Sequence, residues 1–485
     1  VVASERRSSV DANNFGLLDE QLWAAAYTAH PYQWPVVGWM VDIENWKLAD
    51  LKKHFEMGYS PSNATMVVTG DVKAEEVIKL AERYIEPIPS HDPPPPVTLP
   101  SPPKEGKPED KPTLALVPVG YVEGYYAWNF NRPDNHVTNF RGFDNRHNSL
   151  SLTNAALGGE ATWGRVSGRV VLQVGSTPST YYLAEPNLPG TAAANGTSGD
   201  LWKYLQEAWV GYKAPLGRGL LVQAGLVASP IGYESFAVRE NWNYSHSNEF
   251  FGLPYYHAGA RATYPLTDEL SLTASVFNGW NSVVDNNDEK SVEAHVGYKL
   301  PDRLEAQVLY FGGVERDQAR VVAPGVDDAR TGRYWRHHFD AWAEWTATSF
   351  LSFAGQADVG WEPTRYGTAR WFAGALYARG KIGSMLYVAL RGERFWEHLA
   401  RTEVSRDLDH PPIFWGGSEW VTSGTATLEL RPVDHFATYL EYRHDESEAP
   451  IYFRGKIDGD GSAARPFVAN SKYQNTLLLG VTAWL

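Results

Sequence analysis

The stretch SVEAHVGYKL, residues 291–300, shows the pattern that decides the fold of most of this chain. Apolar residues fall on every second position, and the opposite face carries Ser291, Glu293, His295 and Lys299. Successive side chains of a β-strand point to opposite faces, so the pattern predicts a strand with one apolar and one polar face. The stretch LYVALRGE, residues 386–393, alternates in the same way and places Arg391 and Glu393 on its polar face.

Similar strands recur from Gly120 to the C-terminus, and short turns alternate with long polar segments between them. The short turns lie at 214–219, 265–269, 300–303, 380–384 and 431–435, and the long segments near 132–147, 179–200, 233–254, 314–334, 397–412 and 446–471. This alternation is typical of an outer-membrane barrel with short periplasmic turns and long outer loops. It predicts an all-β membrane barrel of about sixteen antiparallel strands. A soluble β-sandwich, which also buries one face of each strand, is the alternative.

The composition narrows the class of protein. The net charge of -14 speaks against a nucleic-acid partner, and the absence of cysteine excludes disulfides and thiolate metal sites. The 19 Trp and 26 Tyr residues suit the aromatic belts of a membrane barrel. No apolar run is long enough for a transmembrane helix. The chain begins VVASERR, without a signal peptide, so we expect the signal of this exported protein to be processed or missing here.

Three regions follow from the pattern along the chain. Residues 1–89 read as a small α/β segment, with helical spacing at 19–29, 46–59 and 73–85 and a short buried strand at 63–72. Residues 90–120 form a Pro-rich linker that cannot pack into a core. The barrel is predicted for residues 121–485.

Several stretches of the barrel region resemble the OmpL-like beta-barrel porins of Gram-negative bacteria. They are YYAWNF at 125–130, RGFDNRHNSLSLTNAAL at 141–157, QVGSTPSTYYLAEP at 173–186 and SPIGYES at 229–235. The resemblance implies an outer-membrane porin for passive diffusion of small hydrophilic solutes or ions. The terminal GVTAWL resembles the signal read by the barrel-assembly machinery, although Leu485 stands where an aromatic residue is commoner. The sequence leaves open whether the barrel forms a homotrimer.

The N-terminal region resembles part of a pitrilysin-type zinc peptidase domain. The resemblance lies in VVASERRSSVDANNFGLL at 1–18, AYTAHPYQWPVVGW at 26–39 and DLKKHFEMGYSPSNATMVVTGDV at 50–72. Such peptidases bind zinc through an H-x-x-E-H motif and a distal Glu, and Glu5 stands at the position of that Glu. The H-x-x-E-H motif is absent from this sequence, so we expect no peptidase activity, no metal site and no cofactor. An enzyme whose catalytic half lies upstream or on a partner chain is one alternative function, and a non-conducting structural or tethering barrel is another.

Charged residues on predicted strands are the candidate site. An Arg or Lys facing lipid at the bilayer midplane costs about 2–4 kcal/mol, so such residues should face the lumen or lie near a rim. The set comprises Arg169, Glu293, Glu305, Arg391, Glu393, Glu441 and Arg443. They would line an aqueous channel; the alternative is that they only fill the interior with ion pairs.

The long aromatic segment at 232–256 is expected to fold inward as a constriction, with Arg239 and Glu240 at its neck. After Gly120 the chain has 32 basic and 40 acidic residues, which predicts a weak preference for cations. Adjacent His337 and His338 should point to opposite faces of a strand and therefore share no metal ion. The N-terminal segment is expected on the periplasmic side of the outer membrane.

Overall fold

The structure, a computed structural model, describes residues 1–27, 30–91, 113–192, 195–315, 335–364, 367–398, 414–415 and 418–485. The chain divides into two compact units, Val1–Lys111 and Pro112–Leu485. Most of the predicted linker at 90–120, and most of the predicted loops at 314–334 and 397–412, lie outside the described residues.

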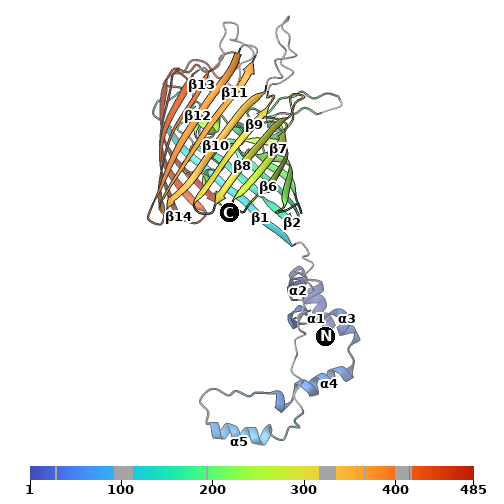
Figure 1. Cartoon of the computed structure of the whole chain (residues 1–485). Helices are drawn as coiled ribbons and strands as arrows, with labels where there is room; N and C mark the ends of the chain where they lie inside the picture. The colour runs from blue at the N-terminus through green and yellow to red at the C-terminus, as the bar shows by residue number, and fades with distance from the viewer. Residues whose placement is uncertain are drawn as a thin grey trace. The chain divides into compact units, whose positions relative to one another are not determined.

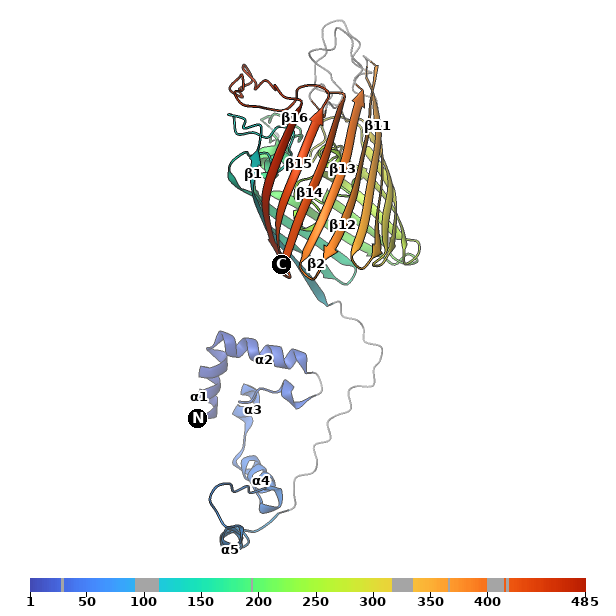
Figure 2. The same ribbon diagram turned by 90° about the vertical axis from the view of Figure 1, so that its left-hand side faces the viewer.

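The second unit is a closed barrel of sixteen antiparallel strands, as the alternation predicts (Figures 1 and 2). Each strand pairs with its neighbours in sequence, and β1 pairs with β16 to close the sheet. The strands are β1 (Leu114–Asn129), β2 (Leu150–Trp163), β3 (Val166–Gly175), β4 (Leu205–Ala214), β5 (Leu220–Ala228), β6 (Tyr256–Pro265), β7 (Leu270–Phe277), β8 (Ser291–Leu300), β9 (Leu304–Gly313), β10 (Arg336–Thr348), β11 (Leu351–Thr364), β12 (Gly367–Ile382), β13 (Leu386–His398), β14 (Trp420–Val433), β15 (Phe436–Ser447) and β16 (Tyr473–Trp484).

The two faces of each strand differ as the sequence predicts. On β3, Val166, Val170 and Leu172 are more than half exposed, whereas Val171 is fully buried. Lipid would cover such an apolar outer surface, because a closed barrel satisfies its backbone hydrogen bonds internally. On β8, the polar face of the stretch 291–300 turns inward, and Glu293 is 2% exposed.

Two details of the barrel differ from the prediction. Strand β1 begins at Leu114, within the predicted linker, because residues 114–120 pair with β2 from Trp163 to Leu157. Short turns and long loops do not alternate strictly either, since only residues 365–366 separate β11 from β12. The described parts of the connections contain four short helices: α6 (Thr177–Tyr181), α7 (Gly199–Trp202), η4 (Val238–Glu240) and α8 (Asn248–Phe251).

The described part of the first unit is helical. It contains α1 (Val2–Arg6), η1 (Arg7–Asp11), α2 (Asn14–Ala26), η2 (Pro31–Gln33), α3 (Met40–Asn45), α4 (Leu48–Gly58), η3 (Pro61–Asn63) and α5 (Ala74–Tyr84). A buried pair between Arg6 and Glu20 links α1 to α2 at 2.7 Å.

The strand predicted at 63–72 is wrong. Residues 64–72 are irregular and exposed, and Val67 is 78% exposed. The described residues of this unit contain no other strand that could pair with this stretch, so its backbone cannot enter a sheet. In the described parts of the chain, no helix has both the length and the apolar character needed to cross a bilayer.

Candidate channel interior

The connection between β5 and β6, residues 229–255, folds into the interior of the barrel. Residues 241–250 are all buried, among them Trp242 (6% exposed), Tyr244 (1%) and Asn248 (3%). This inner segment, as we call residues 229–255, contacts inward-facing side chains of strands far along the chain, including β13 and β15. Its backbone is mostly irregular, so its peptide groups need partners from the barrel wall.

Carboxylates of the wall and of the segment accept hydrogen bonds from its peptide N–H groups. Glu441 on β15 accepts from the N–H groups of Tyr244 at 2.7 Å and Ser245 at 3.1 Å. Glu393 on β13 accepts from the N–H of Asn248 at 2.5 Å. Glu234, within the segment, accepts from the N–H of Ser247 at 2.7 Å.

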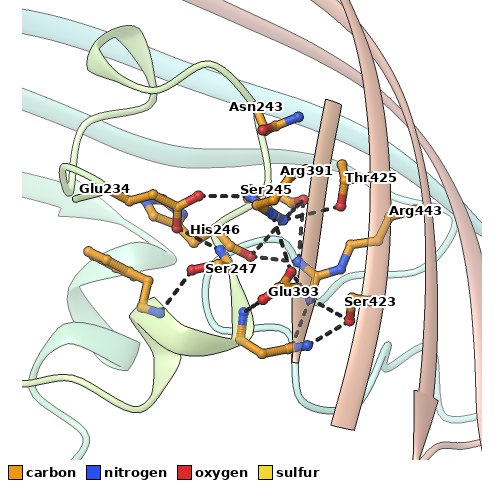
Figure 3. A network of polar contacts seen from close by, with 12 residues as sticks. Glu234, Asn243, Ser245, His246, Ser247, Arg391, Glu393, Ser423, Thr425 and Arg443 are labelled. Carbon is orange, nitrogen blue, oxygen red and sulfur yellow. Dashed lines mark hydrogen bonds and ion pairs between the residues drawn. The ribbon is translucent and has the colours of Figure 1, made fainter. Parts of the chain in front are cut away.

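Two arginines bind the carbonyl groups of the same turn (Figure 3). Arg391 donates to the carbonyl oxygen of Ser245 at 2.6 Å and to Glu234 at 2.7 Å. Arg443 donates to the carbonyl oxygen of His246 at 2.5 Å and to Asp445 at 2.6 Å. Their side chains are 0% and 1% exposed. A fully buried guanidinium group is stable only when a negative charge lies nearby and its N–H groups have hydrogen-bond acceptors. The inner segment supplies some of these acceptors.

Small residues on the wall make room for the aromatic side chains of the segment. Trp242 packs in one cluster with Ala354, Ala375, Tyr377 and Ala389. A Cβ added to Gly480 on β16 would lie 2.2 Å from the ring of Tyr244. The segment therefore fits this side of the wall closely.

Three acidic side chains, Glu249 of α8 and Asp340 and Asp358 of the wall, lie close together in the interior. The amide of Gln356 donates to Asp340 and to Asp358 at 3.1 Å each, and neither carboxylate oxygen of Glu249 has a hydrogen-bond partner among the described residues. Burial, reinforced by the charges of Asp358 and Asp340, raises the pKa of Glu249 well above its usual value. Burial and the neighbouring negative charges therefore favour the protonated form of Glu249.

The segment leaves a cavity of about 180 Å³ on its other side, against β1, β3, β4 and β5. Charged side chains of both signs line it, together with aromatic rings and polar groups, among them Tyr121, Arg169, Glu207, Arg239 and Glu240. Arg169 bonds to Glu207 at 3.0 Å, and the Arg239 guanidinium lies 5.3 Å from the centre of the Tyr121 ring. The Glu240 side chain is 50% exposed.

The structure therefore divides the nine candidate residues by position. Arg169, Arg239 and Glu240 line the cavity. Glu305 lies at the short-turn end of β9, where it pairs with Lys299 at 2.6 Å, and Glu293 bonds to His295 at 2.6 Å. Arg391, Glu393, Glu441 and Arg443 are buried against or beside the inner segment.

Sequence reasoning missed other residues that hold the segment. Glu123 on β1 accepts from the N–H of Val238 at 2.7 Å, and Gln356 on β11 accepts from the N–H of Tyr233 at 2.8 Å. Both lie on inward positions of their strands, so strict alternation could have found them. Glu234 gave no such signal, because it lies in a loop.

The histidine pair behaves as the strand geometry predicts: His338 is 0% exposed and inward, while His337 stacks on outward-facing Trp361. Among the described residues, no group of three or more His, Asp or Glu side chains is arranged to hold a metal ion.

The family model "Putative beta-barrel porin-2, OmpL-like" matches residues 118–482, which is most of the chain. The chain belongs to this porin family. The barrel is thus an outer-membrane porin barrel, and its apolar outer surface and closed sheet agree with this assignment.

Solved outer-membrane barrels are similar to this porin at low sequence identity. DcaP, an outer membrane channel of Acinetobacter baumannii, is 12% identical with a TM-score of 0.48, covering 77% of this chain and 97% of DcaP. OmpT, an outer membrane protein of Vibrio cholerae, is 10% identical with a TM-score of 0.47, covering 77% of this chain and 98% of OmpT.

The N-terminal part of the porin chain is similar to a peptidase family. A model described as "Peptidase M16 inactive domain" matches residues 45–161, although the structure places residues 114–129 and 150–161 in barrel strands. The zinc protease PqqE of Helicobacter pylori is 40% identical over 92 residues, 19% of this chain and 21% of PqqE. The chain thus spans about a fifth of the length of the curated relative it matches.

Proposed function

We propose that this protein is an outer-membrane channel for the passive diffusion of small hydrophilic solutes and ions. A barrel of sixteen strands is wide enough for an aqueous channel. The observation that carries the proposal is the inner segment, which is fixed to one side of the wall and leaves a charged, partly open cavity on the other side.

In this proposal eight of the nine candidate residues take part in the channel. Arg169, Arg239 and Glu240 contact solutes in the cavity, and Glu305 lines the wall at the short-turn end. Glu293, near the long-loop end of β8, is buried beside His295. Arg391, Glu393, Glu441 and Arg443 fix the segment that narrows the channel. These four side chains contact protein on all sides. Their burial supports a constriction and not a water-exposed lining.

We further propose that the short turns are periplasmic. Strand β1 begins, and β16 ends, at the short-turn end of the barrel, so the N-terminal unit would then be periplasmic. Recognition of β16 by the barrel-assembly machinery and assembly into a homotrimer remain predictions from the sequence.

The test is conductance in planar bilayers. The full-length chain, folded in detergent and shown to migrate faster unheated than boiled, should give stable ohmic steps. The variant Arg239→Gln should lower conductance for anions without affecting that migration, because it removes one cation from the cavity wall. Folded barrels that give no steps would contradict the channel and favour a structural or tethering barrel.

We also propose that the chain alone does not cleave peptides. The description of the matched domain as inactive supports this, and Glu5 lies exposed on α1. A purified preparation should show no chelator-sensitive cleavage of a casein substrate, and Glu5→Gln should change nothing. Chelator-sensitive cleavage that Glu5→Gln removes would support the zinc-peptidase alternative.

A further inference from the structure

Three cationic side chains gather around one tyrosine at the short-turn end of the barrel interior. The guanidinium of Arg379 lies 4.2 Å from the centre of the Tyr387 ring, and Lys381 Nζ and the guanidinium of Arg431 each lie 5.6 Å from it. Lys381 is paired with Tyr387 in register, and Tyr387 with Glu429, so these side chains share the inner face. We call Arg379, Lys381, Tyr387, Glu429 and Arg431 the Tyr387 cluster.

The charges of this cluster do not balance. Glu429 is its single carboxylate, and it accepts hydrogen bonds from Arg379 and from Arg431. In the described parts of the chain, no carboxylate forms an ion pair with Lys381. The Tyr387 cluster therefore carries an excess of two positive charges. Its arginine side chains keep partial access to solvent, at 18% for Arg379 and 28% for Arg431, and Lys381 is exposed.

Two polar groups beside the charges lack protein partners. The Nε of Arg379 and the hydroxyl of Tyr439 are buried, and neither has a hydrogen-bond partner among the described residues. Tyr439 is paired with Glu429 in register, so it belongs to the same patch of the inner wall. A buried donor without an acceptor is costly, and an anionic oxygen would satisfy such a donor better than a neutral one.

This excess contrasts with the other charges of the interior. The acidic residues Glu393, Glu441 and Asp445 are at most 6% exposed and are hydrogen-bonded to the inner segment or to arginine. They contribute to the net charge of the barrel but do not contact the aqueous path. Arg391 and Arg443 are buried as deeply, so the net charge of the barrel counts groups of both signs that a permeating ion does not meet.

We propose that the Tyr387 cluster is a binding subsite for oxyanions, that is, for the carboxylate or phosphate group of a solute at the short-turn mouth of the channel. The inference rests on the proposed channel function and names the class of solute. Arginine guanidinium groups match the planar geometry of carboxylate and phosphate oxygens, and the lysine adds a mobile charge at the water-exposed side. An anion held here would lie at one entrance of the path.

The test uses the full-length chain in planar bilayers with inorganic phosphate as the probe. Phosphate added on the short-turn side should lower the chloride conductance of the wild-type channel in a saturable way. Lys381→Glu should weaken this inhibition about tenfold, because the new carboxylate competes for the two arginines. Lys381 has no ion pair to lose, so the variant should fold normally.

Lys213→Glu is the matched control, since it makes the same change of charge at the short-turn end of β4, across the barrel from the cluster. The control should shift reversal potentials only slightly and leave phosphate inhibition unchanged. Conducting wild-type channels that phosphate does not inhibit, or equal weakening in both variants, would overturn the subsite while the channel function stands. If no conductance is found at all, calorimetric titration of the folded protein with phosphate decides: binding lost in Lys381→Glu supports the subsite, and absence of binding overturns it.

Discussion

Arg391 shows how a single buried charge holds the inner segment. Its guanidinium bonds to Glu234, to Glu393 and to the carbonyl oxygen of Ser245. Replacement by methionine removes the charge but keeps most of the side-chain volume. Glu234 and Glu393 then remain buried without the counter-charge that Arg391 supplies. We expect Arg391→Met to destabilise the folded barrel by about 3–5 kcal/mol, the usual effect of breaking a buried ion pair. Urea unfolding followed by the mobility shift on unheated gels measures it.

Arg394, three residues along the same strand, provides the control for this prediction. Its side chain faces outward, where the guanidinium lies 4.7 Å from the centre of the Trp420 ring. Arg394→Met should cost at most about 1 kcal/mol, the range of an exposed cation–π contact. Equal effects of the two substitutions would show that Arg391 does not anchor the segment.

Glu249 makes the position of the inner segment depend on pH. Because its pKa is raised in the folded state, its contribution to stability is complete below the ordinary carboxyl range and is lost as pH rises through the raised pKa. Ionised Glu249 would face the carboxyl groups of Asp358 and Asp340 and be repelled. Conductance should therefore become larger and noisier as the pH rises from the ordinary carboxyl range through the raised pKa of Glu249, and Glu249→Gln should reduce this change. A pH response that is identical in the variant would assign the effect to other groups.

At the scale of elements, the fit between the inner segment and β16 depends on a missing side chain. Gly480→Ala would place its Cβ within 2.2 Å of the Tyr244 ring, so the ring and its peptide N–H must move away from Glu441. Overpacking of this kind typically costs about 1–3 kcal/mol. We expect a higher single-channel conductance and a lower unfolding midpoint.

Gly424→Ala on β14 tests whether the effect is specific, because an added Cβ there meets nothing within 4 Å. This variant should conduct like the wild type. If both alanine variants open the channel, the effect comes from strand backbone and not from Tyr244.

The same elements show what the sequence could and could not predict. Alternation along β8 and β13 was sufficient to assign Glu293, Arg391 and Glu393 to the inner face, because lipid on the outside enforces a period of two. It could not show that Arg391 bonds to Ser245, since 146 residues separate the two and no local pattern encodes the position of a loop inside a barrel. The strand expected at 63–72 failed for a related reason, because a strand forms only where a partner strand is available.

At the scale of the whole molecule, closure of the sheet decides where the chain resides. The pairing of β1 with β16 leaves no open edge, and apolar side chains cover the outer face of the strands. The protein should fractionate with outer membranes and migrate faster unheated than boiled. Recovery as a monodisperse protein in the aqueous fraction would be incompatible with such a surface.

The closed sheet also predicts that the barrel is independent of the N-terminal unit. Both edges of all sixteen strands are paired within Pro112–Leu485, so no further strand is needed to complete the barrel. A variant that lacks residues 1–111 should therefore keep the mobility shift on unheated gels and the single-channel conductance of the full chain. If the truncated barrel folds but conducts differently, the N-terminal unit modulates the channel; if it fails to fold, that unit takes part in assembly, and closure of the sheet alone does not stabilise the fold.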